Sequence, residues 1–165
     1  MRSRAVASVV FAATVGTLMP LIADGQAQAD EPWCVASQLR LTVQAEPARA
    51  GANQRTASLV LVNTAGESCV LQGFPGVDLG AVGDHGGPAS LPRTGQQPHR
   101  VTLAPGGRAT STLTYVTGTS TPGEVILTPP DSTTQLRAPW PADLGAITVW
   151  PEGATHPGTF VGPLH

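Results

Sequence analysis

The sequence contains no lysine, so all nine of its basic residues are arginines, and acidic residues number only eleven. Charged residues make up 12% of the chain and aromatic residues 4%, and the formal net charge is -2 at pH 7. The arginines are scattered singly, so the chain has no basic patch that could neutralise a phosphate backbone. These shortages exclude a typical nucleic-acid-binding protein, and we expect no nucleic-acid partner.

A long hydrophobic run occurs only at the N-terminus. Two arginines precede the apolar stretch Ala5–Ile22, and the segment ends in the small-residue pattern Ala27-Gln28-Ala29 that a signal peptidase recognises. We therefore predict a signal peptide at 1–29, cleaved to leave a secreted chain with no membrane span. Retention at the cell envelope is an open alternative. A permanent N-terminal anchor is less consistent with Pro20 and with the cleavage pattern.

Cysteine is nearly absent, and the single pair is Cys34 and Cys69. An even count in an exported chain predicts one disulfide, because thiols outside the cytosol become oxidised. The spacing is unlike the Cys-x-x-Cys of redox and zinc sites. A blue-copper centre would need a free cysteine and usually a methionine, but both methionines lie in the N-terminal segment. No two of the four histidines are two or four positions apart, so we predict no metal and no cofactor; the histidines are His85, His99, His156 and His165.

Long helical patterns are also missing beyond the N-terminal segment, where many of the 19 glycines and 16 prolines interrupt the chain. Apolar and polar residues alternate instead in short runs between turns, which is typical of strands. The fold predicted is all-β: an antiparallel immunoglobulin-like β-sandwich of seven to nine short strands with one disulfide, in a single domain spanning 30–165. The predicted strands are 39–44, 58–63, 69–71, 77–79, 99–103, 109–116, 124–128, 134–137 and 146–150.

Some segments carry more specific expectations. The run Ser58–Asn63 is apolar on both faces, as a central strand would be. The segment Ala104–Gly107 has the composition of a turn, and Ala142–Leu144 is predicted to form one short turn of helix. The Gly/Pro-rich loop at 82–98 lacks apolar periodicity, so it is either a recognition surface or a stretch without fixed structure.

Three motifs resemble a known family. The first reads Asn63-Thr64-Ala65-Gly66-x-x-Cys69-x-Leu71-x-Gly73-Phe74-Pro75-Gly76-Val77-x-Leu79, the second Val101-x-Leu103-x-Pro105-Gly106-x-x-Ala109, and the third Leu127-Thr128-Pro129-Pro130. Over roughly Cys34–Pro151 the chain resembles the exported actinobacterial family catalogued as domain of unknown function 4232. That resemblance implies an exported or cell-envelope β-sandwich and supplies no activity. Members often carry a second cysteine pair, which this chain lacks.

Trp140 is the one candidate ligand-binding residue. It lies between two prolines in an extended segment, where an exposed indole could stack on a sugar or anchor a protein. The alternative, which we favour, is that Trp140 plugs the open end of the sandwich. Trp150 is expected in the core, and Trp33 is expected to pack against the disulfide. Asn63 is expected to hydrogen-bond to nearby backbone rather than to a ligand.

No motif for nucleophilic catalysis or phosphate binding is present, and a Gly-x-Ser-x-Gly sequence is absent. We therefore expect an exported, non-catalytic module that binds an unidentified protein or a cell-wall glycan. A small secreted enzyme with an unrecognised site and a purely structural surface protein are the alternatives.

Overall fold

The computed structural model describes residues 31–47, 54–82, 86–148 and 158–165. The predicted signal peptide, Trp150, His85 and His156 lie outside these residues. Within them the chain forms strands and two short 3-10 turns. The elements are η1 (Ala36–Gln38), β1 (Leu39–Ala45), β2 (Gln54–Asn63), β3 (Cys69–Gln72), β4 (Gly76–Leu79), β5 (Ala89–Ser90), β6 (Arg100–Leu103), β7 (Arg108–Ser120), β8 (Glu124–Thr128), β9 (Leu136–Pro139), η3 (Ala142–Leu144), β10 (Ile147–Thr148) and β11 (Phe160–Val161).

The prediction of an all-β fold with antiparallel sheets is confirmed, and the predicted helical turn is η3. The strand count was wrong: the described residues hold eleven strands rather than seven to nine. Three of the eleven, β5, β10 and β11, contain only two residues each. β10 falls within the predicted strand 146–150, whereas β5 and β11 were not predicted, because pairings of two residues are fixed by their neighbours in space and leave no alternation in the sequence.

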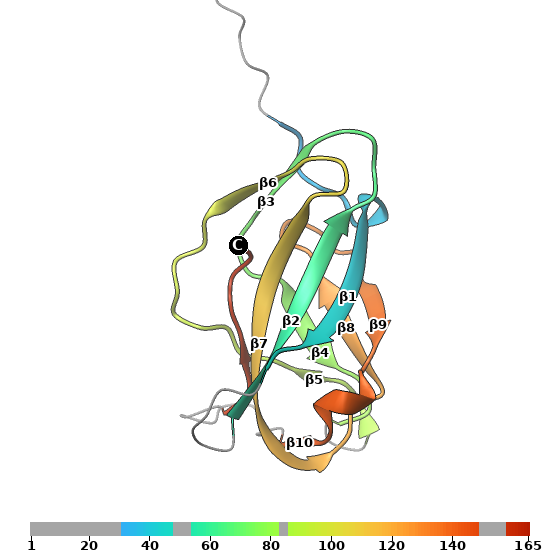
Figure 1. The fold of residues 1–165 in the computed structure, drawn as a ribbon, viewed down its shortest axis with the longest axis vertical. Helices are drawn as coiled ribbons and strands as arrows, with labels where there is room; N and C mark the ends of the chain where they lie inside the picture. Colours follow the sequence, from blue (N-terminus) through green and yellow to red (C-terminus); the bar gives the residue numbers. More distant parts are fainter. Residues whose placement is uncertain (1–30, 48–53, 83–85, 149–157) are drawn as a thin grey trace, which may run out of the picture.

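The strands form three hydrogen-bonded groups. One sheet has the order β1-β2-β7-β10, with β11 also paired to β7; a second has the order β5-β4-β8-β9; and β3 pairs with β6. Figure 1 shows the sheet of β1, β2 and β7 lying across the strands β4, β8 and β9. As predicted, the run Ser58–Asn63 belongs to a central strand, because β2 is paired on both edges.

The longest strand shows how the sequence pattern places its side chains. In β7 the buried residues Ala109, Leu113 and Tyr115 alternate with partly exposed threonines. Because successive side chains of a strand point to opposite faces, the apolar set enters the core and the threonines cover the outer face. Residues from every sheet contribute to this core. Its largest fully buried side chains are Tyr115, Leu59, Leu61, Leu71, Leu79, Leu103, Leu113, Leu127, Leu144, Ile147, Leu164 and Val70.

The predicted disulfide between Cys34 and Cys69 is present, and both residues are buried. It ties the N-terminal segment to β3, and the backbone of Cys34 also donates a hydrogen bond to the Val70 carbonyl. The packing of Trp33 against the disulfide stays a prediction. The Trp33 side chain is 45% exposed and lies under the Arg100 guanidinium, 5.6 Å from the ring centroid.

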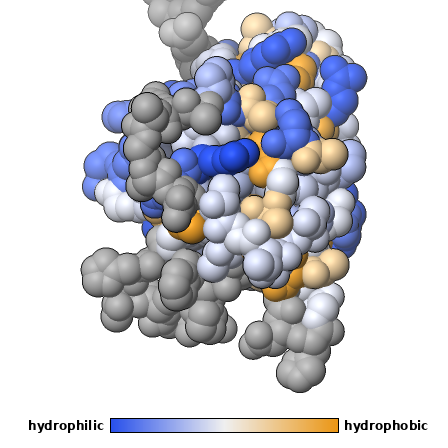
Figure 2. Space-filling view, turned by 60° about the horizontal axis from the view of Figure 1, so that its bottom comes forward, coloured by the Kyte–Doolittle hydropathy of each residue, from blue (hydrophilic) through white to orange (hydrophobic). Residues whose placement is uncertain are grey.

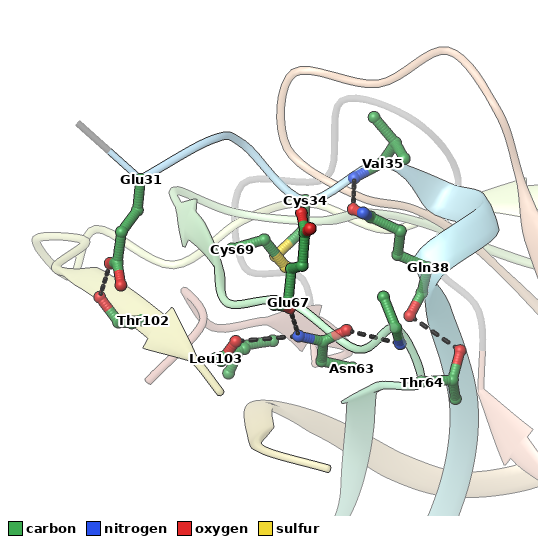
Figure 3. Close-up of a disulfide and its surroundings, with 11 residues drawn as sticks. Glu31, Cys34, Val35, Gln38, Asn63, Thr64, Glu67, Cys69, Thr102 and Leu103 are labelled. Atoms are coloured by element: carbon green, nitrogen blue, oxygen red, sulfur yellow. Dashed lines mark hydrogen bonds between the residues drawn. A yellow bond between two sulfur atoms is a disulfide. The ribbon is translucent and has the colours of Figure 1, made fainter. Parts of the chain in front are cut away.

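Asn63 is fully buried at the end of β2 (Figure 3). Its amide nitrogen donates to the carbonyls of Glu67 and Leu103, at 2.8 and 2.9 Å, and its side-chain oxygen accepts from the backbone N–H of Ala65. The predicted bonding to nearby backbone is therefore confirmed. The bond to Leu103 reaches further, to the start of the turn Ala104–Gly107, so one side chain holds two turns together.

The described part of the loop at 82–98 has fixed pairings. β5 pairs with β4, the backbone N–H of Leu91 donates to the Val77 carbonyl, and Arg93 forms a parallel bridge with Val161. The loop therefore follows the edge of β4 and then the C-terminal segment. It brings residues 94–99 next to the outer face of β7.

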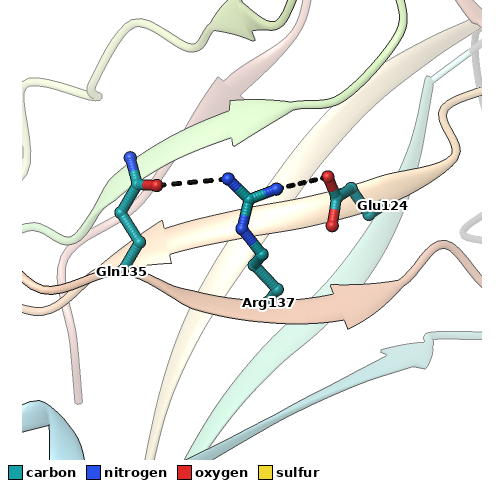
Figure 4. Close-up of polar contacts among 3 residues, drawn as sticks. All are labelled: Glu124, Gln135 and Arg137. Atoms are coloured by element: carbon teal, nitrogen blue, oxygen red, sulfur yellow. Dashed lines mark hydrogen bonds and ion pairs between the residues drawn. The ribbon is translucent and has the colours of Figure 1, made fainter.

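The outer face of the four-stranded sheet carries an ion pair between Arg137 of β9 and Glu124 of β8 (Figure 4). The two side chains are 55% and 36% exposed, and Gln135 accepts a second, longer hydrogen bond from the same guanidinium. Exposed pairs of this kind contribute between zero and about 1 kcal/mol to stability. On the face of the molecule drawn in Figure 2, hydrophobic residues form separate small patches among hydrophilic ones.

Candidate functional site

Trp140 is part of the core. Its side chain is 7% exposed, its indole N–H donates to the Gly145 carbonyl at 2.9 Å, and its ring meets Tyr115 edge-on with centroids 5.7 Å apart. The indole is thus enclosed on its apolar faces and satisfied at its polar atom. The prediction that Trp140 offers an exposed stacking surface is therefore wrong. The burial of Trp140 agrees with the alternative, in which the residue is packed inside the sandwich.

A groove on the outer face of the other sheet is the strongest candidate site. We call it the β2–β7 groove, and its volume is about 1160 Å³. More than half of its lining residues are threonine, serine or glutamine. The lining residues are Glu46, Pro47, Thr56, Ser58, Thr94, Gln96, Gln97, His99, Thr110, Thr112, Thr114, Phe160, Gly162, Pro163 and His165.

The floor of the groove is a ladder of hydroxyl groups on two paired strands. Thr56 of β2 lies opposite Thr114 of β7, and Ser58 lies opposite Thr112. Thr110 continues the β7 row one step further along the same face. Directly opposed residues in an antiparallel pair bring their side chains close together, so the hydroxyls form a compact array. Because the backbone beneath is fully paired, this array is held on a rigid element.

Two chain segments form the walls. The C-terminal segment runs along β7: the backbone N–H of Gly162 donates to the Thr112 carbonyl, and Thr110 and His165 exchange backbone hydrogen bonds. Leu164 anchors this segment because its side chain is fully buried. The loop segment follows on the outside, where the N–H of Thr94 donates to the Val161 carbonyl. The C-terminal wall is therefore hydrogen-bonded to β7, and the loop wall is hydrogen-bonded to the C-terminal segment.

The groove is poor in charge. Among the lining residues that the structure describes, Glu46 is the one acidic side chain, and it accepts a hydrogen bond from the Ser58 hydroxyl. The same described lining includes His99 and His165 but no arginine. Such a surface offers both hydrogen-bond donors and acceptors, since hydroxyls and amides carry both.

Tyr115 lies beneath the same strand, on the core side. Its hydroxyl donates to the Leu144 carbonyl at 3.0 Å, and its ring is buried. Burial raises the pKa of Tyr115 above its ordinary value of 10.0; Asp143 adds to that shift, while Arg55 opposes it. The group is structural, because its hydroxyl is already bonded and faces away from the groove.

The sequence interpretation found one wall of this site and missed the rest. The loop at 82–98 was singled out as a possible recognition surface, and its residues Thr94, Gln96 and Gln97 line the groove. The outward threonines of β7 and the C-terminal segment were not identified. The alternation of threonine at 110, 112 and 114 was the available signal, because side chains two apart share a face.

The structure gives two further findings. None of the helices in the described ranges is long and apolar enough to cross a membrane. Within the same ranges, no three side chains of His, Cys, Asp or Glu lie together as metal ligands would. His99 and His165 both line the groove, but the described residues add no third ligand to them.

Comparison with known proteins gives one match. The family model described as Domain of unknown function (DUF4232) matches residues 34–162, from the first cysteine of the disulfide to the C-terminal wall of the groove. No curated protein and no solved structure matches the chain. The family match covers most of the chain and includes the strands, the disulfide and nearly all of the groove. The chain therefore belongs to the DUF4232 family of domains of unknown function.

Proposed function

We propose that the chain is an exported, non-catalytic module with an immunoglobulin-like β-sandwich fold, which binds a ligand in the β2–β7 groove at the actinobacterial cell envelope. The buried disulfide supports export, because such bonds persist mainly in oxidising compartments. The lysine-free, Ala/Gly/Pro-rich composition supports a GC-rich actinobacterial source. The crossing of the two main sheets supports the sandwich (Figure 1).

The observation that carries the binding role is the groove itself. It combines a floor of paired strands with a C-terminal wall that is hydrogen-bonded to that floor and a loop wall that is hydrogen-bonded to the C-terminal wall. A concave surface with fixed polar groups is typical of ligand sites, because little conformational entropy is lost when the ligand binds. A purely structural surface protein would not need this concave array of hydroxyls.

Export is tested by expressing the full chain in an actinobacterial host and sequencing the N-terminus of the accumulated protein. The expected product begins at Asp30 and is found in the medium or the cell-wall fraction. Recovery of the uncleaved chain from the membrane fraction would contradict this part of the proposal. A variant with Ala27 and Ala29 replaced by arginine is the control, because it removes the cleavage pattern.

Binding is tested by adding solubilised cell wall of the same host to the isotope-labelled processed protein and following amide signals by NMR. We expect changes at Thr110–Thr114 and at Gly162, which frame the groove. A cytosolic extract of the same host is the comparison. Changes confined to the outer face of β8 and β9, around Arg137, or no changes at all, would overturn the groove as the binding surface.

A further inference from the structure

We infer that the ligand of the β2–β7 groove is a neutral oligosaccharide lying along β7. This inference rests on the proposed binding function and adds the chemical class of the ligand.

The charge of the groove argues against ionic ligands. A phosphate, a sulfate or a nucleic acid is normally held by arginine or lysine, and neither residue type is among the lining residues that the structure describes. A cationic ligand would favour several carboxylates, whereas the described lining has one acidic side chain, Glu46, which already accepts a hydrogen bond from Ser58. A ligand without net charge therefore loses the least hydration free energy when it enters the groove.

The floor hydroxyls suit a ligand that is itself covered in hydroxyl groups. Thr110, Thr112 and Thr114 recur about every 6.8 Å along β7, and Thr56 and Ser58 lie about 4.8 Å away on β2. Each threonine hydroxyl both donates and accepts, which matches sugar hydroxyls that do the same. Phe160, which pairs with Thr114, adds one partly buried aromatic ring beside the row, where the apolar face of a sugar ring can pack.

The size of the groove favours a chain of several sugar units. Its volume of about 1160 Å³ exceeds the roughly 300–1000 Å³ of a typical small-molecule pocket. A monosaccharide would leave most of the lining hydroxyls in water. An oligosaccharide aligned with β7 would reach from Thr110 to Thr114 and contact both walls.

A peptide is the main competitor, and the floor is unsuited to it. Peptides that join a sheet do so at a strand edge with free backbone groups. Here β2 is paired with β1 on one side and with β7 on the other. β7 is paired with β2 on one side and with the C-terminal segment on the other. A lipid would need a continuous apolar lining, whereas Pro47, Phe160 and Pro163 are separated by polar residues.

The experiment titrates the processed protein with purified neutral oligosaccharides, namely oligomers of glucose, mannose, galactose, arabinose and N-acetylglucosamine. Heparin and a random decapeptide mixture are the anionic and peptide comparators. Affinity is measured by calorimetry, and the contact surface by amide shifts in NMR. We expect at least one neutral oligosaccharide to bind with shifts at Thr110–Thr114, and affinity to rise with the number of sugar units.

Two variants and one matched control locate the contact. The double substitution Thr112→Val and Thr114→Val removes two hydroxyls while keeping β-branched side chains, and should weaken binding about tenfold or more. Gln96→Ala changes an exposed wall residue and should weaken binding about threefold. Thr42→Val, on β1 of the same sheet but outside the groove, should leave the affinity unchanged.

The outcomes separate this inference from the proposed function. If heparin or the peptide mixture binds in the groove and no neutral oligosaccharide does, the groove is a binding site and the saccharide inference is wrong. If an oligosaccharide binds but the groove variants bind as well as Thr42→Val, the inference fails because the contact lies elsewhere. Lack of binding by every oligosaccharide also overturns it.

Discussion

The side chain of Asn63 connects two turns of the fold through its hydrogen bonds. A buried amide that satisfies two carbonyls and one backbone N–H replaces three contacts that water makes in the unfolded chain. Because such groups cost free energy when they are left unpaired in the interior, the amide is expected to fix the turn after β2 and the turn before β7 together.

Replacing this amide should be strongly destabilising. We expect Asn63→Ala to lower the free energy of unfolding by about 2–4 kcal/mol, because the Leu103 and Glu67 carbonyls lose their donor. Urea denaturation of the full chain measures the change. Thr64→Ala is the control: its exposed hydroxyl makes one bond, to the Gln38 carbonyl, and its loss should cost less than about 1 kcal/mol. Equal losses of unfolding free energy in the two variants would show that the Asn63 amide contributes no more to stability than the Thr64 hydroxyl does.

Tyr115 should control stability in alkaline solution. It is the one tyrosine, the chain has no lysine, and both cysteines are in the disulfide, so no other side chain titrates between about pH 9 and 11. Burial raises the pKa of Tyr115 in the folded state. The unfolded chain therefore loses its tyrosine proton first. Stability is fully present below about pH 10 and falls as the pH rises above it.

The test is urea unfolding from pH 8 to 11, with tyrosinate absorbance followed in parallel. Tyr115→Phe should abolish most of the fall in stability over this range. At pH 8 the variant should be less stable by about 1 kcal/mol, because the Leu144 carbonyl loses its donor. An alkaline fall that persists unchanged in Tyr115→Phe would rule out this residue as its cause.

At the scale of elements, the strands depend on partners that are distant in sequence. β7 is paired with β2 on one edge and with β10 and β11 on the other. Gly118 shows how close the β10 pairing is, since a Cβ atom there would overlap the backbone of Ile147. The C-terminal segment extends the edge beyond β11, with Leu164 inserted into the core and its N–H bonded to the Gly73 carbonyl.

Truncating the Leu164 side chain, which anchors the C-terminal segment, should make the C-terminal wall of the groove open more often. Leu164→Ala is expected to lower the free energy of unfolding by about 2–5 kcal/mol, because it leaves a cavity in the core. Hydrogen exchange at the amides of Thr110 and Gly162 should accelerate as the segment opens more often. Leu136→Ala, at a partly buried position of β9, is the control and should leave those two amides protected.

At the scale of the whole molecule, the disulfide is a cross-link between the first described segment and the sheets. The rest of the fold is held by a core shared among all the sheets and by the backbone ladders. A cross-link stabilises such a fold mainly by restricting the unfolded chain, so its effect is felt by the whole domain and not by one strand.

Loss of the bridge should therefore reduce global stability. We expect Cys69→Ser, or reduction of the wild-type protein, to lower the free energy of unfolding by about 2–5 kcal/mol. The midpoint in denaturant is the measurement. Cys34→Ser should give a similar loss, because either change removes the same bond. A midpoint that does not move in any of these, with the bond verified in the starting protein, would contradict the expectation.

Only part of the candidate site could be predicted from the sequence. The loop residues Thr94 to Gln97 could be singled out, because composition alone marks a surface segment. The hydroxyl floor could not, because it exists only through the register of β2 against β7. The C-terminal wall depends on an equally distant pairing. A single strand reports which of its residues share a face, but not what lies beside that face.

The sequence by itself determined the all-β class, the disulfide between Cys34 and Cys69, the central position of β2 and the backbone role of Asn63. Each follows from local alternation, from counting, or from the short reach of a side chain. Only the tertiary structure decided between the exposed and the packed alternative for Trp140, showed that Trp33 is partly exposed, and brought five separate segments together in one groove. Burial of a lone aromatic residue and assembly of a site depend on which distant strands cover it, and that information is not carried by neighbouring residues.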